Sequence, residues 1–228
     1  MSDPKIEAAF ARHAPWVTRF RIGDHNYGGT FDAPNDSRLD LFWRAFPKAR
    51  RILELGSLEG GHTLGLAQRP EVEHVLGIEG RGANLARARA VQKILQVEKI
   101  DFVQGNLEQI DLAQFGRFDA IYCSGLLYHL PEPWRLVSQF RDVAENVFLW
   151  THCSSEANAE SLANGYRGQR FKEGGPDEVL SGLSPDSFWP SLGSLCNMLT
   201  TSGFSRLHLL DSQPDHPNGP AVTIAAYS

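Results

Sequence analysis

Two histidines in the second half of the chain are candidates for a general base. His129 and His152 each follow a predicted core strand, at the strand end where open α/β sheets bind their ligands. An unperturbed imidazole titrates near neutral pH, so either ring could take a proton from a hydroxyl or an amine. Either ring could equally pack beside a ligand without moving a proton. The three cysteines form no CxxC pair, and the pattern predicts neither a disulfide framework nor a metal site.

A glycine-rich turn precedes both histidines. RILELGSLEGGHT runs from an apolar strand into Gly56 and Gly60. The dinucleotide fingerprint needs a middle glycine where Leu58 stands, and Glu59 puts negative charge where a pyrophosphate would lie. A cofactor without phosphate therefore suits this turn better.

Short apolar runs alternate with helical patterns, which predicts a mostly parallel α/β sheet. The predicted strands are 51–55, 74–78, 100–104, 118–123, 146–150, 205–210 and 221–226. The predicted helices are 60–68, 84–96, 107–112, 133–143 and 188–201, the last capped by Asp186 or Ser187. The last two strands leave no room for a helix between them, so they are predicted to pair antiparallel. The helix at 84–96 is predicted to expose Arg87 and Arg89 on a solvated face.

Four patches in chain order resemble the class I S-adenosylmethionine-dependent methyltransferases. ELGSLEGG looks like their E-x-G-x-G-x-G motif with Leu58 in place of the central glycine, and GIEGR, QGNLEQI and FDAIYCSGLLYHLPEPW follow it. The resemblance implies an α/β, Rossmann-like seven-strand sheet, mostly parallel with an antiparallel last strand and helices on both faces. It implies S-adenosylmethionine as cofactor and S-adenosylhomocysteine as product.

The same resemblance assigns residues to the cofactor. The implied cofactor-binding positions are Glu54, Gly56, Ser57, Gly60, Thr63, Glu79, Gly80, Asn106, Leu107, Ser124, Gly125 and Tyr128. In that family the Glu79 position accepts hydrogen bonds from both ribose hydroxyls, a device that NAD enzymes also use, and the Asn106 position reads the adenine. Asn106 is equally well explained as the N-cap of the short helix at 107–112. The histidines then become the catalytic candidates for methyl transfer to an oxygen or nitrogen of a small-molecule acceptor.

Two segments lie outside the predicted core. Residues 1–45 are expected to form an N-terminal lid segment, and residues 46–228 the core, with a substrate cap at 151–186. In these segments the candidates for substrate contact are Tyr27, Arg38, Tyr166, Arg170 and Trp189. These residues could instead have no contact with a substrate, because charged loop residues are commonly solvated and aromatic side chains commonly pack on the core.

The composition narrows the partners. The chain has 228 residues, 42% of them hydrophobic, and a net charge of −5, which disfavours a nucleic-acid partner. No apolar run is long enough to span a membrane, and the start does not resemble a signal peptide, so a cytoplasmic location is expected. A homodimer is possible. The alternatives are a tRNA-modifying relative, suggested by GLLYHL, a NAD-dependent oxidoreductase, and a non-catalytic cofactor-binding domain.

Overall fold

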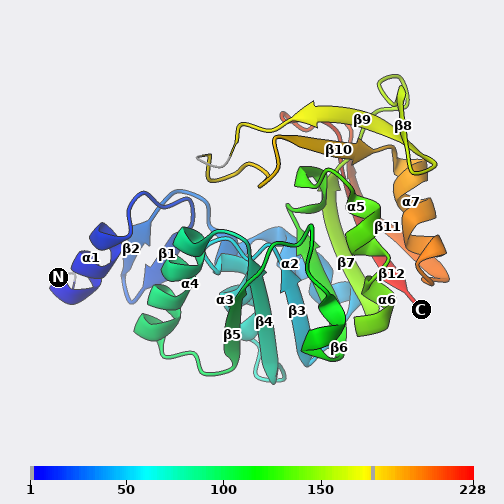
Figure 1. Ribbon diagram of the computed structural model, residues 1–228. Helices are drawn as coiled ribbons and strands as arrows, with labels where there is room; N and C mark the ends of the chain where they lie inside the picture. Colours follow the sequence, from blue (N-terminus) through cyan, green and yellow to red (C-terminus); the bar gives the residue numbers. More distant parts are fainter. Residues whose placement is uncertain (1–2, 176–177) are drawn as a thin grey trace. The chain divides into compact units, whose positions relative to one another are not determined.

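The computed structural model describes residues 3–175 and 178–228, and the chain divides into two compact units, Met1–Gly105 and Asn106–Ser228 (Figure 1). The described residues contain a seven-stranded sheet in the order β11-β12-β7-β6-β3-β4-β5. Its strands are β3 (Arg51–Leu55), β4 (His74–Glu79), β5 (Ile100–Gln104), β6 (Phe118–Ser124), β7 (Ala144–His152), β11 (Arg206–Gln213) and β12 (Ala221–Tyr227). All seven predicted strands are therefore present.

The direction of the strands also follows the prediction. In the first unit β3, β4 and β5 are parallel, and in the second β6 and β7 are parallel. Strand β12 is antiparallel to both β7 and β11, which confirms the antiparallel end of the sheet. All but the first residue of β4 are buried, as expected for a strand covered on both faces.

The first unit places helices and a hairpin around its three strands. Its remaining elements are α1 (Pro4–Arg12), β1 (Arg19–Ile22), β2 (His25–Gly28), η1 (Ala33–Asn35), α2 (Ser37–Ala45), α3 (Gly61–Ala67) and α4 (Gly82–Leu95). Strands β1 and β2 pair antiparallel, so the segment expected to form a lid contains a β-hairpin. Phe10 packs against the rings of Trp16, Phe20 and Tyr27, and this contact anchors α1 to the hairpin.

The second unit contains a smaller sheet in the segment predicted as a cap. Its remaining elements are η2 (Leu112–Phe115), η3 (Leu127–His129), α5 (Pro133–Val137), α6 (Phe140–Val143), β8 (Ser161–Ala163), β9 (Tyr166–Lys172), β10 (Asp186–Pro190) and α7 (Leu192–Thr201). Strands β8, β9 and β10 form an antiparallel sheet, drawn in yellow shades in Figure 1. The sequence analysis predicted no strand within the cap at 151–186, but β8, β9 and the first residue of β10 lie there.

Three predicted helices are wrong in part. Phe188 and Trp189 belong to β10, and α7 begins only after Ser191, whose hydroxyl accepts the Ser194 amide. Asp186 and Ser187 therefore cap no helix, because they pair with β9.

The predicted helix 133–143 is split into α5 and α6, and the predicted helix 107–112 is a turn followed by η2. One side chain accounts for much of both departures. Gln139 accepts a hydrogen bond from the Leu112 amide at 2.8 Å and donates to the Ile110 carbonyl at 3.2 Å. These bonds fasten the 110–112 segment to the junction of the two short helices.

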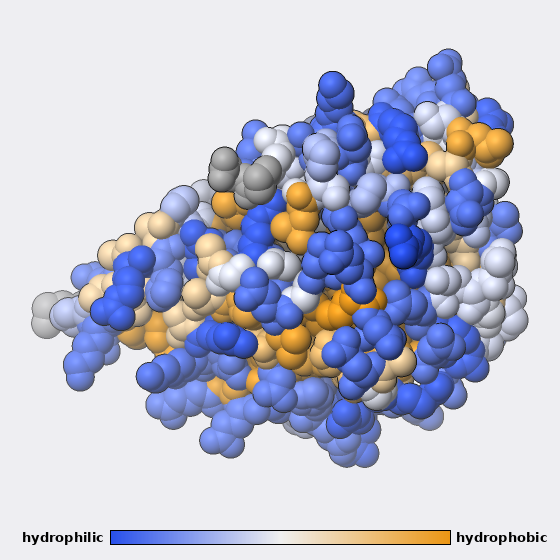
Figure 2. Space-filling view, viewed as in Figure 1, coloured by the Kyte–Doolittle hydropathy of each residue, from blue (hydrophilic) through white to orange (hydrophobic). Residues whose placement is uncertain are grey.

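The surface in Figure 2 carries many hydrophilic side chains, with smaller apolar patches among them. Over residues 3–175 and 178–228, no helix has both the length and the apolar character that a bilayer span requires.

Candidate functional site

The glycine-rich turn joins β3 to α3. The amides of Gly56 and Ser57 donate to the Ile78 carbonyl at 2.9 and 3.0 Å, and the Gly60 amide donates to the Ser57 carbonyl at 2.8 Å. Gly60 has φ of +77°, and a Cβ there would lie 2.8 Å from the Phe102 ring. Conformation and space therefore both require glycine at position 60.

Leu58 stands where the resembling motif has its central glycine, and its backbone keeps a left-handed conformation with φ of +49°. Left-handed conformation is unfavourable for a leucine by about 1–2 kcal/mol, so the surrounding turn must impose it. The turn thus keeps a glycine-like path without the glycine.

Glu79 holds the turn by accepting hydrogen bonds from its backbone. Its Oε2 accepts from the Leu58 amide at 2.9 Å, and its Oε1 accepts from the Arg81 amide at 2.8 Å. The side chain is 6% exposed, and this burial raises the pKa of Glu79, against the opposing effect of the two amides. Oε1 also accepts from Asn84 Nδ2 at 3.4 Å, whereas Oε2 has a second lone pair for a further hydroxyl donor.

Glu54 and Thr63, both predicted at the cofactor, contact each other. The Thr63 hydroxyl donates to Glu54 Oε2, which ties β3 to α3. Burial, reinforced by the nearby charge of Glu79, raises the pKa of Glu54 to about 8 despite the hydrogen bond from Thr63. The carboxyl of Glu54 is therefore largely protonated at neutral pH.

Glu59, which entered the sequence analysis only as a charge that disfavours pyrophosphate, is a structural residue. Its side chain is fully buried and accepts hydrogen bonds from the amides of Val17 at 3.0 Å and Thr18 at 2.6 Å. Arg87 Nε lies 3.7 Å from Glu59 Oε1 and donates to the His13 carbonyl at 2.7 Å. The predicted solvated position of Arg87 is therefore wrong, because the N-terminal segment covers this residue, whereas Arg89 is exposed as predicted.

The two substrate candidates in the N-terminal segment both have protein partners. The Tyr27 ring is stacked on Phe10 with centroids 5.2 Å apart. Arg38 Nε donates to Asp36 Oδ1 at 2.9 Å, and the guanidinium lies 5.6 Å from the centre of the Phe31 ring. A substrate contact by either residue stays a prediction.

One polar atom of the turn is left for a ligand. Ser57 Oγ is buried and has no hydrogen-bond partner within the described residues. Gly80 follows Glu79 at the end of β4, and its carbonyl accepts from Gln104 Nε2 at 3.2 Å. A turn without side-chain bulk at Gly60, an unsatisfied hydroxyl and an acceptor carboxylate fit the adenosine and ribose groups of S-adenosylmethionine.

In the second unit, Asn106 caps a turn rather than a helix. Its Oδ1 accepts from the Glu108 amide at 3.0 Å, and its backbone carbonyl accepts from the Gln109 and Ile110 amides. Asn106 Oδ1, the atom that would accept from the adenine amino group, therefore already accepts one backbone hydrogen bond.

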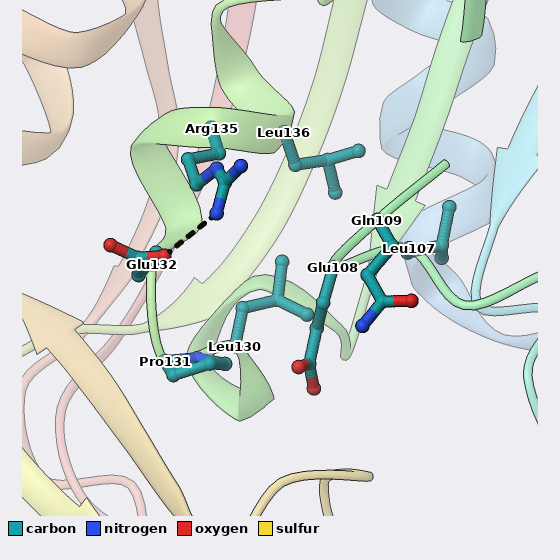
Figure 3. A pocket seen from close by; sticks show the side chains of 8 residues that line it. All are labelled: Leu107, Glu108, Gln109, Leu130, Pro131, Glu132, Arg135 and Leu136. Atoms are coloured by element: carbon teal, nitrogen blue, oxygen red, sulfur yellow. Dashed lines mark hydrogen bonds and ion pairs between the residues drawn. The ribbon is translucent and has the colours of Figure 1, made fainter. Parts of the chain in front are cut away.

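Leu107 lines a pocket with a volume of about 110 Å³ (Figure 3). Leu130 and Leu136 provide its other apolar walls, and the ion pair between Glu132 and Arg135 lies at its rim. This volume is well below the roughly 300–1,000 Å³ of typical small-molecule sites.

The turn after β6 leads to an aromatic and histidine cluster. The Gly125 amide, next to Ser124, donates to the Trp150 carbonyl at 3.1 Å, and Gly125 has φ of +80°. The Tyr128 ring then lies 4.1 Å from the His129 ring and 4.6 Å from the His152 ring. The other members of this histidine cluster are Trp150, Trp189 and His216.

His152 ends β7 and has a defined tautomer. Its Nδ1 lies 2.9 Å from the Gly219 carbonyl oxygen, and because a carbonyl can only accept, Nδ1 carries the hydrogen. Burial lowers the pKa of His152, so the ring is mostly neutral near pH 7 with a lone pair on Nε2. Trp189 stacks on it at 5.0 Å, and the Trp189 Nε1–H is buried without a partner in the described part of the chain.

His129 has an anionic partner that sequence reasoning did not assign. Its Nδ1 lies 2.9 Å from Glu173 Oε2, and the Glu173 side chain is 3% exposed. Glu173 contacts His129, and His216 contacts His152. Both partners are distant in sequence from the histidine that they contact, so local spacing does not indicate either contact.

The two remaining substrate candidates lie in β9. Tyr166 stacks on Trp134 with centroids 6.1 Å apart. Arg170 donates to the Pro131 carbonyl at 3.4 Å and lies over the Phe188 ring. Both therefore have packing roles, and their contact with an acceptor stays a prediction. The described residues contain no group of three or more metal-ligating side chains.

Comparisons with known proteins identify the domains that this chain resembles. A family model described as a methyltransferase domain matches residues 53–146. The crystal structure of the N-terminal domain of EvdMO1, in the presence of S-adenosylhomocysteine and D-fucose, is 33% identical with a TM-score of 0.89. That match covers 100% of this chain and 97% of the other. The match to a longer crystal structure of EvdMO1 covers all of this chain and 48% of the EvdMO1 chain.

Two curated relatives match over shorter stretches. Trans-aconitate 2-methyltransferase of Deinococcus radiodurans is 31% identical over 45% of this chain and 33% of its own length. Ubiquinone biosynthesis O-methyltransferase of Hahella chejuensis is 29% identical over 49% of this chain and 46% of its own length. The chain thus matches less than half of either relative.

Proposed function

Since this chain belongs to the class I S-adenosylmethionine-dependent methyltransferases, we propose that it methylates a hydroxyl oxygen, or alternatively a nitrogen, of a small-molecule acceptor. The observation that carries the proposal is the whole-chain similarity to a domain whose structure was determined with S-adenosylhomocysteine and D-fucose. A hydroxylated, sugar-like compound is therefore the first acceptor class to test.

The residues of the glycine turn would hold the cofactor. Glu79 would accept hydrogen bonds from the ribose hydroxyls, and the unsatisfied Ser57 hydroxyl would gain a partner. Gly60 lets the backbone approach because it carries no Cβ. When bound, S-adenosylmethionine supplies a methyl carbon that bonds to the acceptor atom as its bond to sulfur breaks and leaves the electron pair on sulfur.

The histidine cluster would hold and deprotonate the acceptor. The rings of the cluster provide apolar surroundings for a compact acceptor, and the buried Trp189 Nε1–H offers a donor for a hydroxyl. We assign proton removal to His129 Nε2. His152 would accept a hydrogen bond from the acceptor through Nε2, because its Nδ1–H is already donated to the Gly219 carbonyl.

The other assignments remain part of the proposal. Both curated relatives are named for small-molecule methylation, and a net charge of −5 supports no nucleic-acid acceptor. We retain a cytoplasmic location and a possible homodimer as expectations. We also retain the lid at residues 1–45 and the substrate cap at residues 151–186 as proposals. The β8–β10 sheet supports an ordered cap.

The test begins with calorimetric titration of the purified protein with S-adenosylhomocysteine, with NAD as the control ligand. Micromolar binding of the first alone is expected. Methyl transfer from S-adenosylmethionine to D-fucose and to a panel of other hydroxylated and amine compounds is then measured. Binding of NAD instead would support the oxidoreductase alternative, and binding without transfer to any acceptor would support a non-catalytic domain.

A variant separates the base from the cofactor site. His129→Ala is expected to lower turnover by about 100-fold or more, the usual contribution of a positioned base, with cofactor affinity nearly unchanged. His208→Ala, an exposed histidine of β11, is the matched control and should behave like the wild type. Unchanged turnover in His129→Ala would reduce His129 to a packing role.

A further inference from the structure

The carboxylate of Glu173 is surrounded by hydrogen-bond donors. Its Oε2 accepts from the Ser181 hydroxyl at 2.9 Å, from the Gly182 amide at 2.6 Å and from His129 Nδ1 at 2.9 Å. Burial alone would raise the pKa of Glu173, but hydrogen bonds from neighbouring residues and from the His129 ring outweigh it, and the pKa lies below its usual value. The group is therefore an ionised, acceptor-only carboxylate at neutral pH.

The backbone around this carboxylate is also fixed. The Glu173 amide donates to the Pro185 carbonyl at 2.9 Å, and the His129 amide donates to the Leu126 carbonyl at 2.8 Å. A Cβ on Gly182 would lie 2.6 Å from the His129 carbonyl oxygen, so this glycine packs directly on η3. Backbone hydrogen bonds and the close packing of Gly182 therefore fix the positions of both Glu173 and His129.

An ionised carboxylate determines the tautomer of its imidazole partner. Since Glu173 can only accept, His129 Nδ1 carries the hydrogen, and in the neutral ring Nε2 carries the lone pair. When Nε2 gains a proton, the ring becomes cationic beside a buried negative charge, which stabilises the charged form. This pairing gives a histidine the two properties that a general base needs.

The second histidine of the cluster provides an internal contrast. His152 has the same Nδ1–H tautomer, but its partner is the neutral Gly219 carbonyl. A neutral acceptor orients the ring without compensating a positive charge on it. The choice of base between the two rings therefore depends on Glu173.

We infer that Glu173, in the segment at 151–186, is the positioning residue that sets the tautomer of His129 and stabilises its protonated form during methyl transfer. The inference rests on the proposed function. As the bond between acceptor oxygen and methyl carbon forms, the hydroxyl proton passes to His129 Nε2. The ring later returns this proton to solvent, and Glu173 stays ionised throughout.

The experiment uses the full chain with Glu173→Gln, which removes the charge at constant size, and Glu173→Asp, which restores it. Glu173→Gln is expected to lower kcat by at least tenfold, while acceptor KM and the affinity for S-adenosylhomocysteine change less than about threefold. Glu173→Asp should recover part of kcat. Ser181→Ala, which removes another donor to the same oxygen without changing charge, is the matched control and should retain most of kcat.

A measurement that needs no activity completes the test. Nitrogen-15 NMR of histidine-labelled protein is expected to show the Nδ1–H tautomer at His129 in the wild type and a smaller fraction of it in Glu173→Ala, which leaves Nδ1 without its acceptor. His152 should keep its Nδ1–H signal in both proteins, because Gly219 is unaltered.

The possible failures are distinguishable. An unchanged His129 tautomer in Glu173→Ala, or an unchanged kcat in Glu173→Gln, overturns the role of Glu173. Loss of S-adenosylhomocysteine affinity together with kcat shows a merely structural contact and also overturns it. A wild type that methylates no acceptor refutes the proposed function instead, and the NMR comparison still decides whether Glu173 sets the tautomer.

Discussion

The glycine turn of the first unit and the histidine cluster of the second differ in how their polar atoms are satisfied. In the turn, Glu54, Glu59 and Glu79 all accept hydrogen bonds from neighbouring backbone or hydroxyl groups. In the cluster, the Trp189 Nε1–H is buried without a partner among the described residues, and His152 uses only one ring nitrogen in the hydrogen bonds described. The turn uses most of its polar groups to maintain its own shape, whereas the cluster keeps polar groups available for an acceptor. Substitutions in the turn should therefore change stability, and substitutions in the cluster should change turnover or acceptor affinity.

The largest effect is expected from Glu59→Ala. The substitution leaves Arg87 buried without its counter-ion and the Val17 and Thr18 amides without their acceptor, which should lower the free energy of unfolding by about 3–5 kcal/mol. Urea denaturation measures the change, with Glu71→Ala at an exposed position as control. A loss below about 1 kcal/mol would show that the N-terminal segment does not depend on this acid.

Glu79→Ala should affect both stability and binding. It leaves the Leu58 and Arg81 amides without their acceptor, at a cost of about 1–3 kcal/mol, and removes the proposed acceptor for the ribose hydroxyls. We expect the affinity for S-adenosylhomocysteine to fall at least tenfold in calorimetry. Glu98→Ala, an exposed acid of the same unit, is the control. Wild-type affinity in Glu79→Ala would mean that the ribose is bound elsewhere.

Glu54 should give the turn a pH-dependent stability. Its pKa rises from the ordinary 4.5 to about 8 in the folded chain, so the folded state holds a proton that the unfolded state releases. This contribution is complete below about pH 4.5 and is lost as the pH rises toward about 8, by at most about 1.4 kcal/mol per pH unit. Glu54→Gln has no such proton. Urea unfolding at about pH 5 and about pH 8 should therefore show a steeper loss of stability in the wild type than in the variant. Parallel curves would contradict the raised pKa.

The smallest change in stability is expected from Trp189→Phe. The phenyl ring can still stack on His152 and Phe171, and only an unsatisfied N–H is lost along with part of the ring. The free energy of unfolding should change by about 1 kcal/mol or less, while acceptor KM rises severalfold. A large loss of stability with unchanged KM would place this indole among the structural residues and weaken the contrast between the two regions.

The sheet and the turn could be predicted because their signals are local. Apolar runs of strand length and the glycines of 51–63 identify the strands and the turn without knowledge of distant contacts. The helix at 188–201 failed at its start for the opposite reason. Phe188 and Trp189 are compatible with either element, and pairing with Arg170 and Gln169 of β9, which are 18 and 20 residues away, makes them a strand.

The candidate site was predictable only in part. The sequence suggested Glu79, His129 and His152, but not the contacts that distinguish their roles. Glu59 contacts amides 41 and 42 residues away, and Glu173 contacts a ring 44 residues away. No periodicity connects such positions.

The sequence alone therefore determined the strands of the α/β sheet, its antiparallel end and the glycine turn, because backbone conformation and hydrophobic periodicity depend on near neighbours. Only the tertiary structure decided which acids are structural and which histidine has a carboxylate partner. The physical reason is that the charge state of a buried group depends on donors, acceptors and burial supplied by segments that meet only in the folded chain.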